Sequence, residues 1–302
     1  MKDPARLLLY LAGVVVLGAI LAPPLFWLGH SLAAHAAFSR FAQYDFETYF
    51  HRALLIAAIA LLWPLLRALS MRTWSDLGLE KNPRAGADLL AGFLIAALPL
   101  LCCGAVLVGI HVYSLRDAFL WGKMPAVLIA AIVVPVLEEL FFRGFILGVL
   151  LRSFSRIAAL LLTSAFFSII HFLKAPKTTT PNESVNWLSG FVSIANSFWQ
   201  FRDPVLLAAG FLTLFLIGCI LADARLTTRS LWLPIGLHAG WIFANGAFNK
   251  AAHRELLALP WLGKDLLVGI VPFILALASW ALVRGWVRNA DARTAQSLSR
   301  TR

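Results

Sequence analysis

The chain has 302 residues, of which 60% are apolar and only 14% are charged, and its mean hydropathy is +0.81. A soluble protein carries charge on about a quarter of its residues, so this composition excludes two ordinary soluble domains, a disordered chain and a fibrous repeat. We predict an all-α, polytopic integral membrane protein that lies in the cell membrane, in contact with its lipids.

The net charge of +11 comes from 26 Lys and Arg residues against 15 Asp and Glu residues. The basic residues are scattered between apolar segments and gather at the C-terminus, as expected for cytoplasmic loops near anionic lipid. Nucleic acid is therefore not a predicted partner. The three cysteines lie inside apolar runs, which argues against a disulfide framework.

Eight apolar runs reach or approach the roughly 20 residues that a helix needs to cross a bilayer. The predicted spans are 7–29, 53–69, 89–112, 124–151, 157–173, 205–222, 231–249 and 266–283. With the N-terminus inside, 15 basic residues fall on the inner side and 10 on the outer side, while Arg143 lies within a span. This bias favours a cytoplasmic location for both termini.

We divide the chain into N-terminal spans with a polar connection (residues 1–85), a membrane core (86–290) and a basic tail (291–302). Residues 185–201 are apolar and aromatic but short, which indicates an interfacial or re-entrant segment. Such a segment could cover a site, although a lipid-surface anchor made of its aromatic residues is the more expected reading. No inverted repeat of the transporter type is visible.

Glu138 and Glu139 are the only acidic residues that lie deep within an apolar run. A carboxylate at that depth costs at least about 2.5 kcal/mol, so two adjacent ones indicate an ion path, a proton relay or a reaction site. An ion pair that locks two helices together is the structural alternative.

Arg143 follows Glu139 by four residues, which places both on one helix face in the favourable order for an ion pair. Glu138 points about 100° away and is left without a local cation. We therefore predict that Glu138 is a general base, which takes a proton from water and returns it to a leaving amine. The Glu139–Arg143 pair would fix the helix.

His171 lies in the next span, on the same face as Phe167. A histidine within a membrane is more often a hydrogen-bonding group between helices than a ligand. If the two spans form a hairpin that turns near residue 155, Glu138 is 17 residues from the turn and His171 is 16 residues from it. Both would then lie at one level.

His238 lies in the span 231–249, and Asn245 follows on the same face. His238 is only about 8 residues, or ~12 Å, from the inner end of this span, which is shallower than Glu138 unless the two preceding helices protrude. Glu138, His171 and His238 could together hold a nucleophilic water, directly or through a divalent metal such as Zn²⁺. A His-Glu-x-x-His helix is absent, so the spacing does not require a metal.

These residues resemble a known family. Residues 138–143 match an EExxxR motif, Phe167 to His171 match FxxxH, and His238 matches the later histidine of the CPBP family. This family comprises CAAX prenyl proteases and bacteriocin-processing intramembrane proteases and is also called the ABI family. The resemblance covers residues 125–249, and residues 74–79 also look like a segment that many members carry.

The resemblance implies an intramembrane metalloendopeptidase in which Glu138 activates water, while His171 and His238 position it or stabilise the oxyanion. It implies a protein or peptide substrate, either a prenylated C-terminus or a bacteriocin, leader or sorting peptide. One departure is Ile242, where the family commonly has asparagine. Asn245 could take that role from a position ~10 Å further along the axis, which is a different geometry for oxyanion stabilisation.

Two other functions stay open. A non-catalytic membrane scaffold or regulator of the same fold is favoured by Ile242. A proton- or cation-coupled transporter would also place Glu138 and Glu139 in the membrane, although transporters often show the inverted repeat that is not seen here.

Overall fold

The computed structural model describes residues 3–71, 73, 82–173, 175–176, 179–256, 260–263 and 266–300, with side chains as far as Asn289. Contacts divide the chain into a first unit (Met1–Arg72 and Ile169–Pro204) and a second unit (Thr73–Ser168 and Val205–Arg302). Residues 169–204 thus group with the N-terminal spans. The boundaries at residues 85 and 290 stay a prediction.

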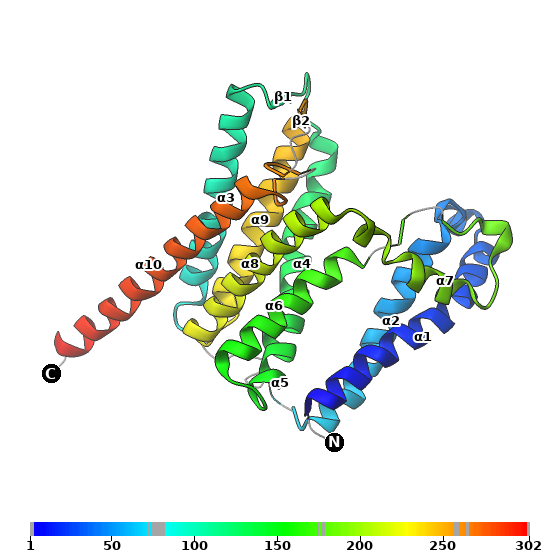
Figure 1. The fold of residues 1–302 in the computed structure, drawn as a ribbon, viewed down its shortest axis with the longest axis horizontal. Helices are drawn as coiled ribbons and strands as arrows, with labels where there is room; N and C mark the ends of the chain where they lie inside the picture. The colour runs from blue at the N-terminus through cyan, green and yellow to red at the C-terminus, as the bar shows by residue number, and fades with distance from the viewer. Residues whose placement is uncertain are drawn as a thin grey trace. The chain divides into compact units, whose positions relative to one another are not determined.

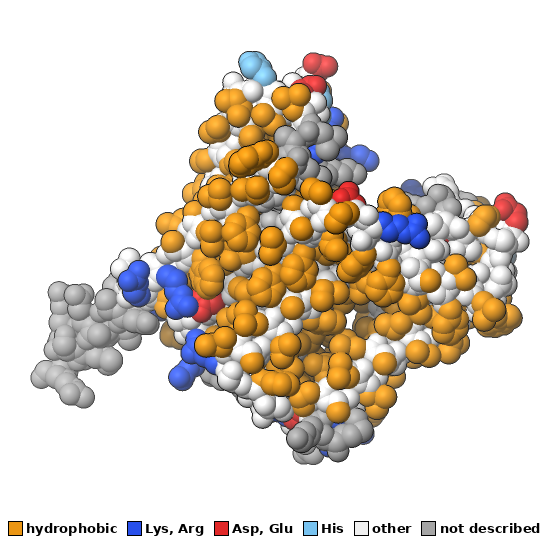
Figure 2. Space-filling view, viewed as in Figure 1, with side chains coloured by type: hydrophobic (Ala, Val, Ile, Leu, Met, Phe, Trp, Pro, Cys, Tyr) orange, Lys and Arg blue, Asp and Glu red, His pale blue; other side chains and the backbone are white. Residues whose placement is uncertain are grey.

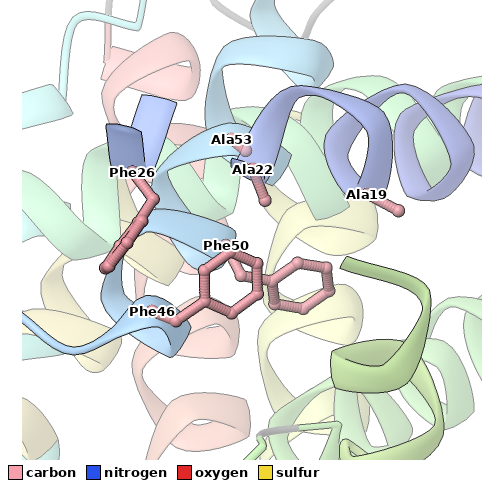
Figure 3. Packing of buried hydrophobic residues seen from close by; sticks show 6 residues of the cluster. All are labelled: Ala19, Ala22, Phe26, Phe46, Phe50 and Ala53. Atoms are coloured by element: carbon pink, nitrogen blue, oxygen red, sulfur yellow. The ribbon is translucent and has the colours of Figure 1, made fainter. Parts of the chain in front are cut away.

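Two long helices, α1 (Asp3–Leu32) and α2 (Phe46–Ala68), build the first unit. Small alanine side chains let the two backbones approach closely, and phenylalanine rings fill the remaining space. The carboxylate of Asp45 accepts a hydrogen bond from the Thr48 backbone N–H at 2.9 Å and so caps α2. Figure 3 shows the resulting core, which consists of Ala19, Ala22, Phe26, Phe46, Phe50 and Ala53.

The segment between the two parts of the second unit contains the short helix α7 (Ser189–Asn196), flanked by the 3₁₀ turns η5 (Asn182–Ser184) and η6 (Trp199–Arg202). With eight residues, α7 is too short to cross a bilayer, as expected for residues 185–201. It packs on α1, where a side chain at Gly190 would collide with the backbone of Ala19. The 3₁₀ turn η1 (Ala36–Gln43) links α1 to α2.

The second unit is a bundle of seven helical segments among the described residues, all of them long except α5 (Figure 1). They are α3 (Ala85–Gly109), α4 (Met124–Glu139), α5 (Leu147–Leu151), α6 (Arg156–Phe172, to Ser168 in this unit), α8 (Pro204–Thr228, from Val205), α9 (Trp232–Ala251) and α10 (Ile270–Arg300). The predicted hairpin is present, because α5 ends at Leu151 and α6 begins at Arg156.

A small antiparallel sheet joins the ends of α3 and α9. Its strands are β1 (Tyr113–Leu115) and β2 (Ala252–Arg254), and the 3₁₀ turn η3 (Trp121–Lys123) leads from β1 into α4. Along their length α3 and α9 are packed backbone to backbone. A side chain at Gly92 or Gly236 would meet main-chain atoms of the opposite helix, so these two glycines permit the close approach.

Six helical stretches of the described chain are long and apolar enough to cross a membrane. They are Asp3–Leu32, Phe46–Ala68, Ala85–Gly109, Trp121–Leu151, Pro204–Thr228 and Ile270–Asn289. The shorter apolar helix α6 has 17 residues, and α9 carries several polar residues. Hydrophobic side chains cover the visible surface of both units (Figure 2). The all-α polytopic class is confirmed, and the count of eight spans stays a prediction.

Candidate functional site

The helix that carries the paired glutamates changes its winding directly after them. α4 ends at Glu139 and continues as the π-helix η4 (Leu140–Ile146), which contains Arg143, before α5 begins. Such π-helical turns occur mostly inside α-helices and frequently at functional sites. Here the turn buries Phe142, Arg143 and Phe145 together, so the charged residue of the motif lies among aromatic rings.

The predicted pair between Glu139 and Arg143 is present. The Arg143 Nη1 atom donates to Glu139 Oε1 at 3.0 Å, and both side chains are fully buried. Nη2 donates to the backbone oxygen of Gly218 on α8 at 3.3 Å. The guanidinium lies 4.3 Å from the centre of the Phe167 ring on α6, close enough for a cation–π contact. Arg143 therefore links α4, α6 and α8.

His238 on α9 completes this buried cluster. Its Nδ1 atom lies 2.8 Å from Glu139 Oε1, and its ring meets Phe167 edge to face at 6.1 Å between centroids. An ionised carboxylate only accepts hydrogen bonds, so Nδ1 carries the hydrogen in this contact when Glu139 is ionised. In a neutral imidazole Nε2 then presents a lone pair.

Glu138 faces the opposite nitrogen of the same ring. Its Oε2 atom lies 3.9 Å from His238 Nε2. The Glu138 side chain is 30% exposed, whereas that of Glu139 is 0% exposed, which agrees with the angular offset expected for adjacent helical residues. Both glutamates thus lie beside His238, but only the Glu138 side chain is partly exposed to solvent.

His238 lies level with both glutamates, although the distances to the helix ends had suggested a shallower position. The helical path continues past Glu138 to Leu151, whereas α9 begins at Trp232, only six residues before His238. The helix ends therefore do not mark a common level.

His171 lies in the last turn of α6, four residues after Phe167, and belongs to the first unit. Its predicted place beside Glu138 stays a prediction. Within the described ranges, no group of three or more His, Cys, Asp or Glu side chains could hold a metal ion. Of the predicted metal ligands Glu138, His171 and His238, the structure brings the first and the last together.

Asn245 makes a contact that the sequence did not predict. Its side-chain oxygen accepts hydrogen bonds from the Leu266 backbone N–H at 3.2 Å and from Asn249 Nδ2 at 3.3 Å, so it ties α9 to the segment before α10. Its proposed oxyanion role stays a prediction. Ile242 lines an apolar cavity between α4 and α9.

Three further carboxylates are buried, although they lie outside the predicted spans. They are Glu47, Asp88 and Asp223. Glu47 accepts hydrogen bonds from Thr179 Oγ1 at 2.6 Å and from the Thr180 backbone N–H at 3.0 Å. An acidic residue in the first turn, such as Glu47, is typical of a helix start. Its hydrogen-bond partners Thr179 and Thr180 lie more than 100 residues away in the sequence, so no local pattern predicts these contacts.

The fold and the cluster define a polytopic, all-α membrane protein with a buried Glu–Arg–His network beside a partly exposed glutamate. Residues 120–244 match the family model described as Type II CAAX prenyl endopeptidase Rce1-like. This stretch runs from the start of α4 into α9 and contains both glutamates, Arg143, His171 and His238. This match supports the CPBP/CAAX protease family that the motifs indicated, over residues 120–244 of the chain.

No curated protein and no solved structure matches the chain. The segment at residues 74–79, which also resembles this family, lies outside the described residues.

Proposed function

We propose that the chain is an intramembrane metalloendopeptidase of the cell membrane that hydrolyses a peptide bond in a membrane-associated or lipidated protein. Glu138 acts as the base and then as the acid, and His238 with His171 holds the attacking water. The observation that carries the proposal is the 3.9 Å separation of Glu138 Oε2 and His238 Nε2, beside a histidine whose other nitrogen contacts Glu139.

The two facing atoms are both acceptors when Glu138 is ionised and His238 is neutral. Their separation exceeds a hydrogen bond. Glu138 Oε2 is itself buried, and we propose that the site admits one water molecule that donates to both atoms. Such a water directs its lone pairs away from the two side chains, toward a substrate carbonyl. Glu138 can take one of its protons and later pass it to the leaving amine.

The buried pair of Glu139 and Arg143 supports this geometry. Glu139 Oε1 contacts both Arg143 and His238 Nδ1, so it fixes the imidazole tautomer and orientation while Arg143 balances the carboxylate charge. A carboxylate on the far nitrogen of a histidine is the usual arrangement behind a metal-binding or water-binding imidazole. Glu139 and Arg143 are thus positioning residues.

A divalent metal such as Zn²⁺ fits the same two donors. Carboxylate oxygen and imidazole Nε2 are common zinc ligands at about 2.0–2.2 Å, and two atoms 3.9 Å apart can both reach one ion. His171 is the proposed third ligand. A bound metal would supply Lewis acidity and a more acidic water.

If the metal is required, a chelator should abolish processing and Zn²⁺ should restore it, whereas full activity after chelation would show that protein groups suffice.

The test compares peptide termini by mass spectrometry in membranes of cells that carry the wild-type protein, Glu138→Gln, His171→Ala or no copy. We expect new termini with the wild type alone, at normal abundance of both variants. Glu183→Gln is the matched control, because Glu183 lies exposed in a turn and its substitution should leave processing intact. Unchanged termini in cells with the Glu138→Gln variant would show that Glu138 is not the base.

Ile242 favours a second candidate, a non-catalytic scaffold or regulator of the same fold. An isoleucine supplies no hydrogen bond to an oxyanion, and here its side chain lines an apolar cavity. Under this function Glu138→Gln would preserve every phenotype, and no peptide terminus would depend on the protein.

A further inference from the structure

The apolar cavity that Ile242 lines lies in the second unit, between α4 and α9, and extends away from the glutamates toward the other end of both helices. Its volume is about 360 Å³, within the range of small-ligand sites. The lining is largely apolar, with small residues that leave space between the helices. The lining residues are Lys123, Ala126, Val127, Ala130, Ile242, Asn245, Gly246, Lys250 and Leu267.

Two lysines form the polar part of this cavity. Lys123 immediately precedes α4, and Lys250 lies in the last turn of α9. The two helix ends are held together by a hydrogen bond from the Leu120 backbone N–H to the Lys250 carbonyl at 3.3 Å. In the part of the chain that the structure describes, neither ammonium group has an ion-pair partner. Two lysines that have no ion-pair partner among the described residues therefore line one apolar cavity.

The lysines lie at the level expected for lipid headgroups. Trp121, two residues before Lys123, is 74% exposed, and exposed tryptophan is enriched at the membrane–water interface. From there the apolar cavity follows two helices into the membrane, so its far end lies at acyl-chain depth. Lys123 is 15 residues before Glu138, which corresponds to about 22 Å along the helix.

We propose that this cavity binds one anionic phospholipid, with its phosphate between Lys123 and Lys250 and part of an acyl chain against Ala126, Ala130 and Gly246. The positive charge of the two lysines favours an anionic phospholipid over the other candidate occupants. An uncharged isoprenoid chain offers the two lysines no anionic group, and a zwitterionic lipid brings no net negative charge, whereas an anionic phospholipid brings both a phosphate and a net negative charge.

The test measures binding of dioleoylphosphatidylglycerol to the purified full chain in detergent, by native mass spectrometry over a lipid titration. Dioleoylphosphatidylcholine has the same chains without net charge and serves as the reference lipid. We expect one tightly bound phosphatidylglycerol. Lys123→Ala/Lys250→Ala should bind it about 30-fold more weakly, the factor for roughly 1 kcal/mol per lysine, and Lys123→Arg/Lys250→Arg should retain it.

A second pair of variants tests the apolar part with both charges intact. Ala126→Phe places a ring in the cavity from an exposed position of α4 and should weaken phosphatidylglycerol binding. Leu128→Phe on the same helix, at a residue that is 47% exposed and outside the cavity lining, should leave binding unchanged.

Three results would overturn the proposal. Equal affinity for the two lipids would indicate ordinary annular contact. Displacement of phosphatidylglycerol by inorganic phosphate alone would indicate an anion site without an acyl chain. Displacement by a neutral isoprenoid alcohol would assign the cavity to an isoprenoid chain. None of these results bears on whether Glu138 is a catalytic base, because lipid binding is measured without turnover.

Discussion

Glu139 uses one carboxylate oxygen for two partners, Arg143 at 3.0 Å and His238 at 2.8 Å. All three side chains are buried, so each depends on the others for charge balance or hydrogen bonding. Removal of one member of a buried charge network costs far more than the net contribution of the network to stability. At the residue scale the network is therefore more sensitive than Glu138, which is partly exposed.

This difference predicts that Glu139→Gln destabilises the fold. The substitution leaves the Arg143 charge uncompensated in a low-dielectric environment, for which the expected loss is about 3–5 kcal/mol in the free energy of unfolding. Thermal unfolding in detergent measures the effect, with Glu183→Gln as the exposed control. A Glu139→Gln protein as stable as the wild type would mean that the pair contributes little.

At the element scale, carboxylates near helix ends attach α10 to the rest of the second unit. Asp223 on α8 accepts hydrogen bonds from Trp280 Nε1 and Arg284 Nη2, both at 2.8 Å. On α3, Asp88 accepts one from Trp286 Nε1 at 3.0 Å. α10 is thus held by indole groups that reach buried carboxylates, in addition to apolar packing.

We predict that Asp223→Ala lowers the free energy of unfolding by about 1–3 kcal/mol, because it leaves the Trp280 N–H without its acceptor. Arg284→Ala should cost less, about 0–1 kcal/mol, since the Arg284 side chain is 52% exposed and its ion pair is screened by water. Chemical unfolding of both variants provides the comparison. An equal loss in the two variants would assign the attachment to the ion pair instead.

At the scale of the whole molecule, two contacts agree with the topology expected from the predicted spans, in which corresponding ends of α3 and α9 lie on the same side. β1 pairs with β2, which puts the connections after α3 and α9 on one side of the membrane. Asn82 donates to Ser230 Oγ at 3.2 Å, which puts the connections before α3 and α9 on the other side. The charge bias assigns the first pair to the outside and the second to the cytoplasm.

This orientation predicts which side of the membrane each loop reaches. In a background without the three native cysteines, Ser39→Cys and Ser114→Cys should react with a membrane-impermeant thiol reagent in intact cells. Ser153→Cys, in the turn between α5 and α6, should react only after the cells are opened. The reverse pattern would invert the topology and place both termini outside.

The sequence by itself determined the class of protein and the helical hairpin, because hydropathy and the i, i+4 spacing are local properties, and it proposed the candidate site residues. It could also predict the Glu139–Arg143 pair, since both partners lie on one helix. Only the tertiary structure shows that His238 lies beside both glutamates, that Asn245 contacts Leu266 and that Lys123 and Lys250 line one cavity. These contacts join residues that are far apart in the chain. They depend on the distance between the packed helices and on the relative depth of the helices. Glycines such as Gly236 permit close packing, but they do not specify which helices pack or at what depth.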